Sequence, residues 1–144
     1  MQKFTSILIL LFSLIILVSC SQNKTIFLES AWIRPGIKGN TTAGYFVVVN
    51  PTNQSDKLVS VSGIASKQIE IHMTTMENDV MSMHKQEYIE IPENSKVEFK
   101  PQGLHIMLLD LTDDIIEGDQ IELTFQFEKA GSITQTFEIK TSDE

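Results

Sequence analysis

The chain contains little cysteine, tryptophan and basic charge. Of its 144 residues one is Cys and one is Trp, and 11 Lys or Arg face 19 Asp or Glu, for a formal net charge of −8. A single Cys excludes an internal disulfide and a site built on paired thiolates, so stability must come from packing. The acidic balance, without any basic stripe, argues against a nucleic-acid partner.

Long apolar runs are also missing, except at the start of the chain. Lys3 precedes an apolar run over Ile7–Val18, the pattern of an export signal. About a dozen apolar residues fall short of the roughly 20 that span a bilayer, which disfavours the alternative of an uncleaved helical anchor. The sequence Leu17-Val18-Ser19-Cys20 resembles the lipobox of bacterial lipoproteins. This resemblance implies cleavage before Cys20 and lipidation of that residue.

We therefore expect a lipoprotein signal peptide over 1–19, a lipidated tether over 20–24 and one domain over 25–141. Removal of 19 of the 144 residues leaves 125, enough for a single domain with a real core. Lys3 leaves with the signal, so 10 basic residues face 19 acidic ones and the net charge becomes −9. The expected location is a membrane-anchored lipoprotein that faces the periplasm or the cell exterior.

The rest of the sequence predicts an all-β domain. Short apolar and β-branched runs alternate with turn residues, and no stretch has helical periodicity. Leu123, Phe125 and Phe127 alternate with polar residues, as on a half-buried strand. Two packed sheets, or a Greek-key barrel, are expected. Strands are predicted over 26–33, 43–50, 58–62, 69–73, 81–91, 96–99, 105–111, 120–128 and 133–140.

Histidine and methionine gather in one part of the chain. All three His, and all six Met except Met1, fall between His72 and Met107. Random scattering over the mature chain would do this with a probability on the order of 10⁻⁴. Core packing does not explain it, because packing would not draw His to the same place. The cluster indicates a binding site.

The spacing allows four of these side chains to converge. His105 and Met107 are two apart on a predicted strand and so project from one face. His72 and Met83 flank a segment long enough for a hairpin, with its tip expected over Thr74–Asp79. Two imidazoles and two thioethers would then meet at one end of the sandwich.

This donor set favours Cu(I). Thioethers suit Cu(I), whereas zinc and iron sites recruit thiolate, imidazole or carboxylate, and calcium and magnesium want oxygen. A blue-copper electron-transfer site needs a Cys thiolate, which the mature domain lacks once Cys20 is lipidated.

The four residues also resemble a known family. His72, Met83, His105 and Met107 reproduce H-x10-M-x21-H-x-M, the signature of PCu(A)C-type periplasmic copper(I) chaperones. The likeness extends to "AWIRPG" at 31–36, "TAGYFVVVN" at 42–50, "KPQGLHIMLLDL" at 100–111 and "FEKAG" at 127–131.

The resemblance implies a cupredoxin-like β-sandwich that binds one Cu(I) through His72, Met83, His105 and Met107. It also implies delivery toward the CuA centre of cytochrome c oxidase, directly or with a Sco-type partner. Two alternatives stay open: a lipoprotein that buffers copper for tolerance, and a metal-free β-sandwich interaction module. No nucleophile–base pair, phosphate loop or paired catalytic carboxylates are recognisable, so no enzyme activity is expected.

Two departures from the family pattern concern the site. His84-Lys85 stands where many relatives have Arg-Pro, and Gln102-Gly103 where they have Gly-Gly. The first departure makes His84 a possible competing ligand, although alternation on a strand points it away from Met83.

Other residues near the cluster have open or ordinary roles. Met73, Met76 and Met81 are open between a secondary Cu(I) shelf, a docking rim and plain packing. Trp32 and Tyr45 are expected in the core with their polar tips near its edge. The acidic residues near the cluster, Glu70, Glu77 and Asp79, are expected to be ordinary solvated charges.

Overall fold

The structure is a computed structural model that describes residues 24–77 and 80–141. The predicted signal peptide, Cys20 and the tether up to residue 23 lie outside these residues. Within the two described ranges no helix could span a membrane, and all the regular structure there is β-strand, which confirms the all-β prediction. The strands are β1 (Phe27–Ile33), β2 (Thr42–Asn50), β3 (Asp56–Ser62), β4 (Ser66–Glu77), β5 (Val80–Lys85), β6 (Ile89–Ile91), β7 (Ser95–Phe99), β8 (Leu104–Leu111), β9 (Gln120–Phe127) and β10 (Gly131–Ile139).

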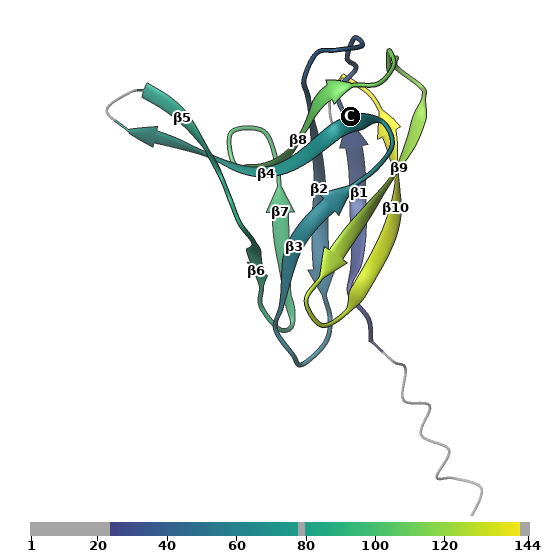
Figure 1. Cartoon of the computed structure of the whole chain (residues 1–144). Helices are drawn as coiled ribbons and strands as arrows, with labels where there is room; N and C mark the ends of the chain where they lie inside the picture. Colours follow the sequence, from purple (N-terminus) through teal and green to yellow (C-terminus); the bar gives the residue numbers. More distant parts are fainter. Residues whose placement is uncertain (1–23, 78–79, 142–144) are drawn as a thin grey trace, which may run out of the picture.

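The strands form one continuous hydrogen-bonded sheet that curls over on itself. Their order is β5-β4-β8-β7-β2-β1-β10-β9-β3-β6, and β8 also pairs with β2. In Figure 1, β3 and β9 lie in front of β1 and β2, so that two layers enclose the core. The pairing of β1 with β10 is parallel, and their neighbours β2 and β9 pair with them antiparallel.

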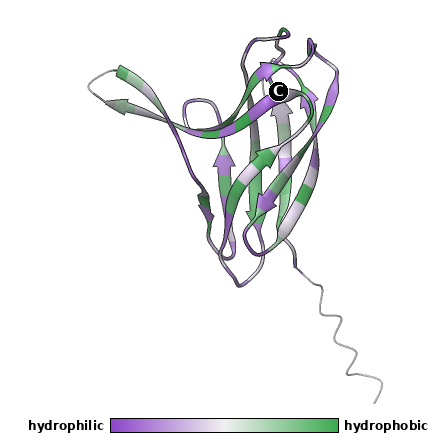
Figure 2. Ribbon diagram, in the orientation of Figure 1, coloured by the Kyte–Doolittle hydropathy of each residue, from purple (hydrophilic) through white to green (hydrophobic). Residues whose placement is uncertain are grey.

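The core is built from the inward faces of both layers. Phe46 of β2 stacks on Phe99 of β7, with ring centroids 4.1 Å apart. It also meets Phe125 of β9 and Phe137 of β10 edge-on, at 4.9 and 5.8 Å. Polar and apolar residues alternate along the strands, as Figure 2 shows, because successive side chains of a strand point to opposite faces.

Two of the predicted segments differ from the observed strands. The single strand expected over 81–91 is divided, because β5 pairs with β4 whereas β6 pairs with β3. Between β5 and β6 the chain therefore leaves the edge of β4 and joins the edge of β3. The expected turn over Thr74–Asp79 is also shorter than predicted: β4 continues to Glu77, and the connection at residues 78–79 lies outside the described residues.

Trp32 and Tyr45 are buried, but on the opposite face of the sheet from the main core. Both are less than 5% exposed, and their ring centroids lie 4.7 Å apart. The Arg34 guanidinium lies 5.3 Å from the Tyr45 ring and the Lys140 ammonium 5.8 Å from the Trp32 ring. The contact between the two rings and the two long cationic side chains thus cover the aromatic surface that faces away from the hydrophobic core.

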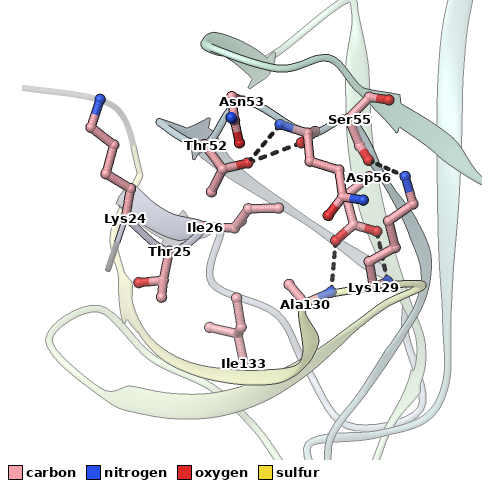
Figure 3. A pocket seen from close by; sticks show the side chains of 11 residues that line it. Lys24, Thr25, Ile26, Thr52, Asn53, Ser55, Asp56, Lys129, Ala130 and Ile133 are labelled. Atoms are coloured by element: carbon pink, nitrogen blue, oxygen red, sulfur yellow. Dashed lines mark hydrogen bonds between the residues drawn. The ribbon is translucent and has the colours of Figure 1, made fainter. Parts of the chain in front are cut away.

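At one end of the sandwich, Asp56 joins the start of β3 to the β9–β10 turn. It is 4% exposed, and its carboxylate accepts N–H bonds from Lys57 at 2.7 Å, Lys129 at 2.9 Å and Ala130 at 2.7 Å. Figure 3 shows this carboxylate pointing at the turn, beside a cavity of about 510 Å³ near Lys24. A carboxylate with three N–H partners satisfies donors that the turn would otherwise leave unpaired.

Asp56→Ala is expected to lower the free energy of unfolding by about 1–3 kcal/mol, because buried N–H groups lose their acceptor. Urea denaturation measures the loss. Asp113→Ala is the matched control, since the Asp113 side chain is 83% exposed and surface substitutions change stability by about 0.5 kcal/mol or less. Equal stability of the two variants would contradict the structural role of Asp56.

Candidate metal centre

Three neighbouring strands, β5, β4 and β8, carry all four predicted ligands. His72 of β4 lies opposite His105 of β8 on one side and opposite Lys85 of β5 on the other. Directly opposed residues of antiparallel strands share a face. The two imidazole centroids are 5.9 Å apart, so the structure brings the predicted histidines together.

The two methionines lie on the same face. Met83 is opposite Thr74, and Met107 is opposite Glu70. Thr74 and Glu70 are each two residues from His72, which keeps them on its side of β4. All four predicted side chains therefore project from one surface of the sheet.

A cleft of about 580 Å³ opens beside this surface. Its lining includes Met81, Met83, His105, Met107, Tyr45 and Arg34. Three of the four predicted ligands thus line it, whereas His72 adjoins it through His105. Burial raises the pKa of the Tyr45 hydroxyl, and the charge of Arg34 partly offsets this, so Tyr45 contributes no anion at neutral pH.

His105 is held in one tautomer. It is 5% exposed, and its Nδ1 lies 3.0 Å from the carbonyl oxygen of Gly103. A carbonyl can only accept, so Nδ1 carries the hydrogen and Nε2 carries the lone pair. A backbone carbonyl in this position is a common orienting partner of a metal-ligating histidine.

The Gly103 carbonyl is itself placed by a tight turn. The Gly103 N–H donates to the Lys100 carbonyl at 3.1 Å, and the Gly103 carbonyl accepts from the Thr74 N–H at 3.1 Å. Pro101 occupies the second position of this turn, and Gln102 the third with a φ of 65°. A proline followed by a positive φ is typical of a type II turn, which favours glycine at the third position. The glycine of many relatives at position 102 therefore suits the local backbone, and Gln102 strains it.

Gln102→Gly is expected to raise the free energy of unfolding by about 0.5–1 kcal/mol. The left-handed conformation costs a non-glycine residue about 1–2 kcal/mol, and the greater freedom of glycine in the unfolded chain offsets part of that gain. Chemical denaturation reports the change. Gly131→Ala, at a φ of 78° in another turn, is the reciprocal control and should destabilise. A Gln102→Gly variant less stable than wild type would show that Gln102 does not strain the turn.

His72 is also hydrogen-bonded, and its partner was misjudged from the sequence. Its Nε2 lies 2.8 Å from Oε2 of Glu70, whose side chain is only 15% exposed. The expectation that Glu70 is an ordinary solvated charge is therefore wrong. The residue two positions before His72 on a strand shares its face, and this signal was present in the sequence.

Glu70 remains an anion because two partners stabilise its charge. Lys85 donates to Oε1 at 2.6 Å, and together with His72 this contact lowers the pKa of the Glu70 carboxyl. A carboxylate only accepts, so Nε2 of His72 carries a hydrogen, and Nδ1 is the nitrogen that can offer a lone pair to a metal. That Nδ1 is buried and has no hydrogen-bond partner among the residues that the structure describes.

The donor set fits a soft monovalent metal. Nδ1 of His72 has no hydrogen-bond partner among the described residues, and the two thioethers lie on the same face as both imidazoles. Across residues 24–77 and 80–141, no three His, Cys, Asp or Glu side chains gather as in a hard-metal or zinc site. Thioether and imidazole ligands together match Cu(I) better than zinc, calcium or magnesium.

The remaining candidates lie elsewhere. His84 is exposed and pairs with Met73, so both are on the face opposite to the four predicted ligands. Met76 pairs with Met81, and this pair shares the ligand face. Asp79 and the side chain of Glu77 lie outside what the structure describes.

Known proteins resemble this chain over most of the domain. The model of the LpqE-like family, described as "Putative lipoprotein LpqE-like", matches residues 26–139. A protein of Rickettsia prowazekii, "Uncharacterized protein RP573", is 39% identical over 102 residues, which are 67% of this chain and 56% of that protein. The chain thus spans little more than half the length of this curated relative.

Solved structures share the fold. The copper-bound PCuAC domain from PmoF2 is 26% identical, with a TM-score of 0.69 over 82% of this chain and 94% of that one. The Cu(I) form of DR1885 from Deinococcus radiodurans is 20% identical, with a TM-score of 0.65 over 85% and 83% of the two chains. The predicted cupredoxin-like sandwich is confirmed. The chain belongs to the LpqE-like family, and its domain is of the PCuAC type found in copper chaperones.

Proposed function

We propose that this protein is a copper chaperone that binds one Cu(I) and passes it on, and that it is not an enzyme. The observation that carries the proposal is the gathering of two imidazoles and two thioethers on one face of β5, β4 and β8. Likeness to a copper-bound PCuAC domain supports it. The ion is cargo, so the protein must hold it firmly yet release it.

The proposed ligands are His72, Met83, His105 and Met107. His105 offers Nε2, because its Nδ1–H is donated to Gly103, and His72 offers Nδ1, because its Nε2–H is donated to Glu70. Neutral donors without a thiolate favour Cu(I) over Cu(II) and bind less strongly than a pair of cysteines. Met83 is 56% exposed, so a ligand from the protein that receives the copper could replace it first in a ligand exchange.

Export and anchoring fit this role. In the proposal, residues 1–19 are removed and Cys20 carries the lipid. The chain enters the domain beside the cavity that Lys24 and Thr52 line, whereas Thr42 lines the cleft. Thr42 and Asn50 are the two ends of β2, about 25–30 Å apart for a strand of this length. The copper cleft would thus face away from the membrane, toward a recipient such as the CuA subunit of cytochrome c oxidase or a Sco-type partner.

Copper stoichiometry tests the function. The mature chain is expected to retain one Cu(I) in anaerobic competition with a chromophoric chelator, and the fourfold variant of the proposed ligands is expected to retain none. Wild-type protein without bound copper would instead support a metal-free interaction module. Loss of oxidase activity in a deletion strain under copper limitation would support delivery, and unchanged activity would support buffering.

Glu70→Ala is expected to weaken Cu(I) binding by about 10–100-fold, the usual cost of removing a partner that orients a ligating histidine. Chelator competition measures the change, and Glu70→Gln, which keeps an acceptor for Nε2–H, should recover most of it. Glu98→Ala is the control, because Glu98 forms a surface ion pair with Lys100. Equal affinities of Glu70→Ala and Glu98→Ala would show that Glu70 does not orient His72.

A further inference from the structure

Three methionines of this domain are exposed rather than packed in the core. The hydrophobic core, over the residues that the structure describes, contains no Met. Met76, Met81 and Met83 are instead 65%, 53% and 56% exposed. Large apolar side chains left in water give up the stabilisation that burial provides, so their placement calls for another role.

The strand register places this exposed group next to the proposed copper ligands. Met76 of β4 is directly opposite Met81 of β5, and one step inward Thr74 is opposite Met83. Met81 and Met83 are two residues apart and therefore on one face. Met81 also lines the cleft that Met83 and His105 line. A row of thioethers thus runs from the outer end of the hairpin to the cleft.

The hairpin that carries this row projects from the sandwich. In Figure 1 the outer ends of β4 and β5 extend beyond the other strands. Met73, which pairs with His84, is on the other face of the same hairpin. The enrichment of exposed Met is therefore on the side that faces the site.

We propose that Met76 and Met81 form a second, weaker Cu(I) site through which the ion reaches the four-residue site. Directly opposed residues of antiparallel strands have Cβ atoms about 4.5–5.5 Å apart. The three rotatable bonds of each Met let two sulfur atoms close on one ion. Cu(I) accepts thioether ligands, and two such donors hold it less firmly than the four donors of the inner site.

The transfer needs no redox partner. Copper remains Cu(I) throughout: a bond to Met83 replaces the first Cu–S bond that breaks, and bonds to the other inner ligands replace the second. This inference rests on the proposed function, because the row leads to a site that must itself bind copper.

Methionine-methyl NMR tests the inference on the mature chain, labelled with ¹³C at Cε and titrated anaerobically with Cu(I). The first equivalent is expected to shift the methyls of Met83 and Met107. The second is expected to shift those of Met76 and Met81 and to leave Met73 in place. If Met76 and Met81 keep their apo shifts through two equivalents while Met83 and Met107 move, the inference is wrong and the proposed function stands. If Met83 and Met107 do not move with the first equivalent, the proposed function itself is wrong.

Substitutions give a second readout. Met76→Leu with Met81→Leu keeps the apolar bulk of the pair, and it is expected to lower the capacity from two Cu(I) to one while the first affinity stays within about threefold. Met73→Leu is the matched control on the opposite face, and it is expected to keep the capacity for two Cu(I) and the first affinity. A double variant that retains two equivalents would overturn the second site.

Discussion

The mature chain with His105→Ala and Met107→Leu is expected to bind Cu(I) at least about 1,000-fold more weakly than the wild type. Loss of a group that only orients a ligand already costs about 10–100-fold in affinity, and this variant loses two ligands. His105 and Met107 come from the same strand, β8, so their removal leaves donors from β4 and β5 alone. Competition with a Cu(I) chelator over a range of chelator concentrations measures the affinity.

The chain offers a control of the same residue types. His84→Ala with Met73→Leu also removes one imidazole and one thioether, but both lie on the opposite face of the β4–β5 hairpin. This variant is expected to keep the wild-type affinity. An unchanged affinity in the His105/Met107 variant, or an equal loss in the control, would rule out the proposed ligand set.

Phe46→Ala is expected to lower the free energy of unfolding by about 3–5 kcal/mol, the range for removing a buried aromatic ring. Phe46 is 1% exposed, and its ring touches Phe99, Phe125 and Phe137 across both layers. Its loss leaves a cavity that three rigid strands cannot easily close. Urea or thermal denaturation followed by circular dichroism measures the change.

The control for Phe46 is another phenylalanine. Phe27 at the start of β1 is 44% exposed, so Phe27→Ala should cost much less than the core substitution. A Phe46→Ala loss of under about 1 kcal/mol would mean that the contacts between the layers are not the centre of the core. The copper site depends on this core indirectly, because β2 also pairs with β8 at Ala43 and Met107.

The fold class was predictable because alternation along strands is a local property. Leu123, Phe125 and Phe127 are fully buried, as their spacing on β9 predicts. The division of 81–91 was not predictable in the same way. An apolar run shows that a segment is extended, but not that its first half pairs with β4 and its second half with β3.

The candidate site was also predictable only in part: features set by spacing along one strand were predictable, and features set by contacts between strands were not. The sharing of one face by His105 and Met107 follows from their spacing, and so does the position of His84 on the other face. The role of Glu70 depends on Lys85, which reaches it from a neighbouring strand 15 residues along the chain. Such a contact requires the register between β4 and β5, which the sequence does not display. The strain at Gln102 likewise depends on a backbone angle.

The row of exposed methionines was visible in the sequence as a cluster, but its use was open. Alternation from His72 and Met83 already separates Met73 from Met81, but Met76 fell in the expected turn, and the register is what pairs it with Met81. A count of residues cannot supply this pairing, because it carries no information about which strands are neighbours.

X-ray absorption at the copper edge of the mature chain loaded with one Cu(I) tests the central claim most directly. The proposed ligands predict a first coordination shell of two sulfur and two nitrogen scatterers, with the edge shape of Cu(I). Met83→Leu is expected to remove one of the two sulfur scatterers. A shell of nitrogen or oxygen alone, with no sulfur, would contradict the proposed site.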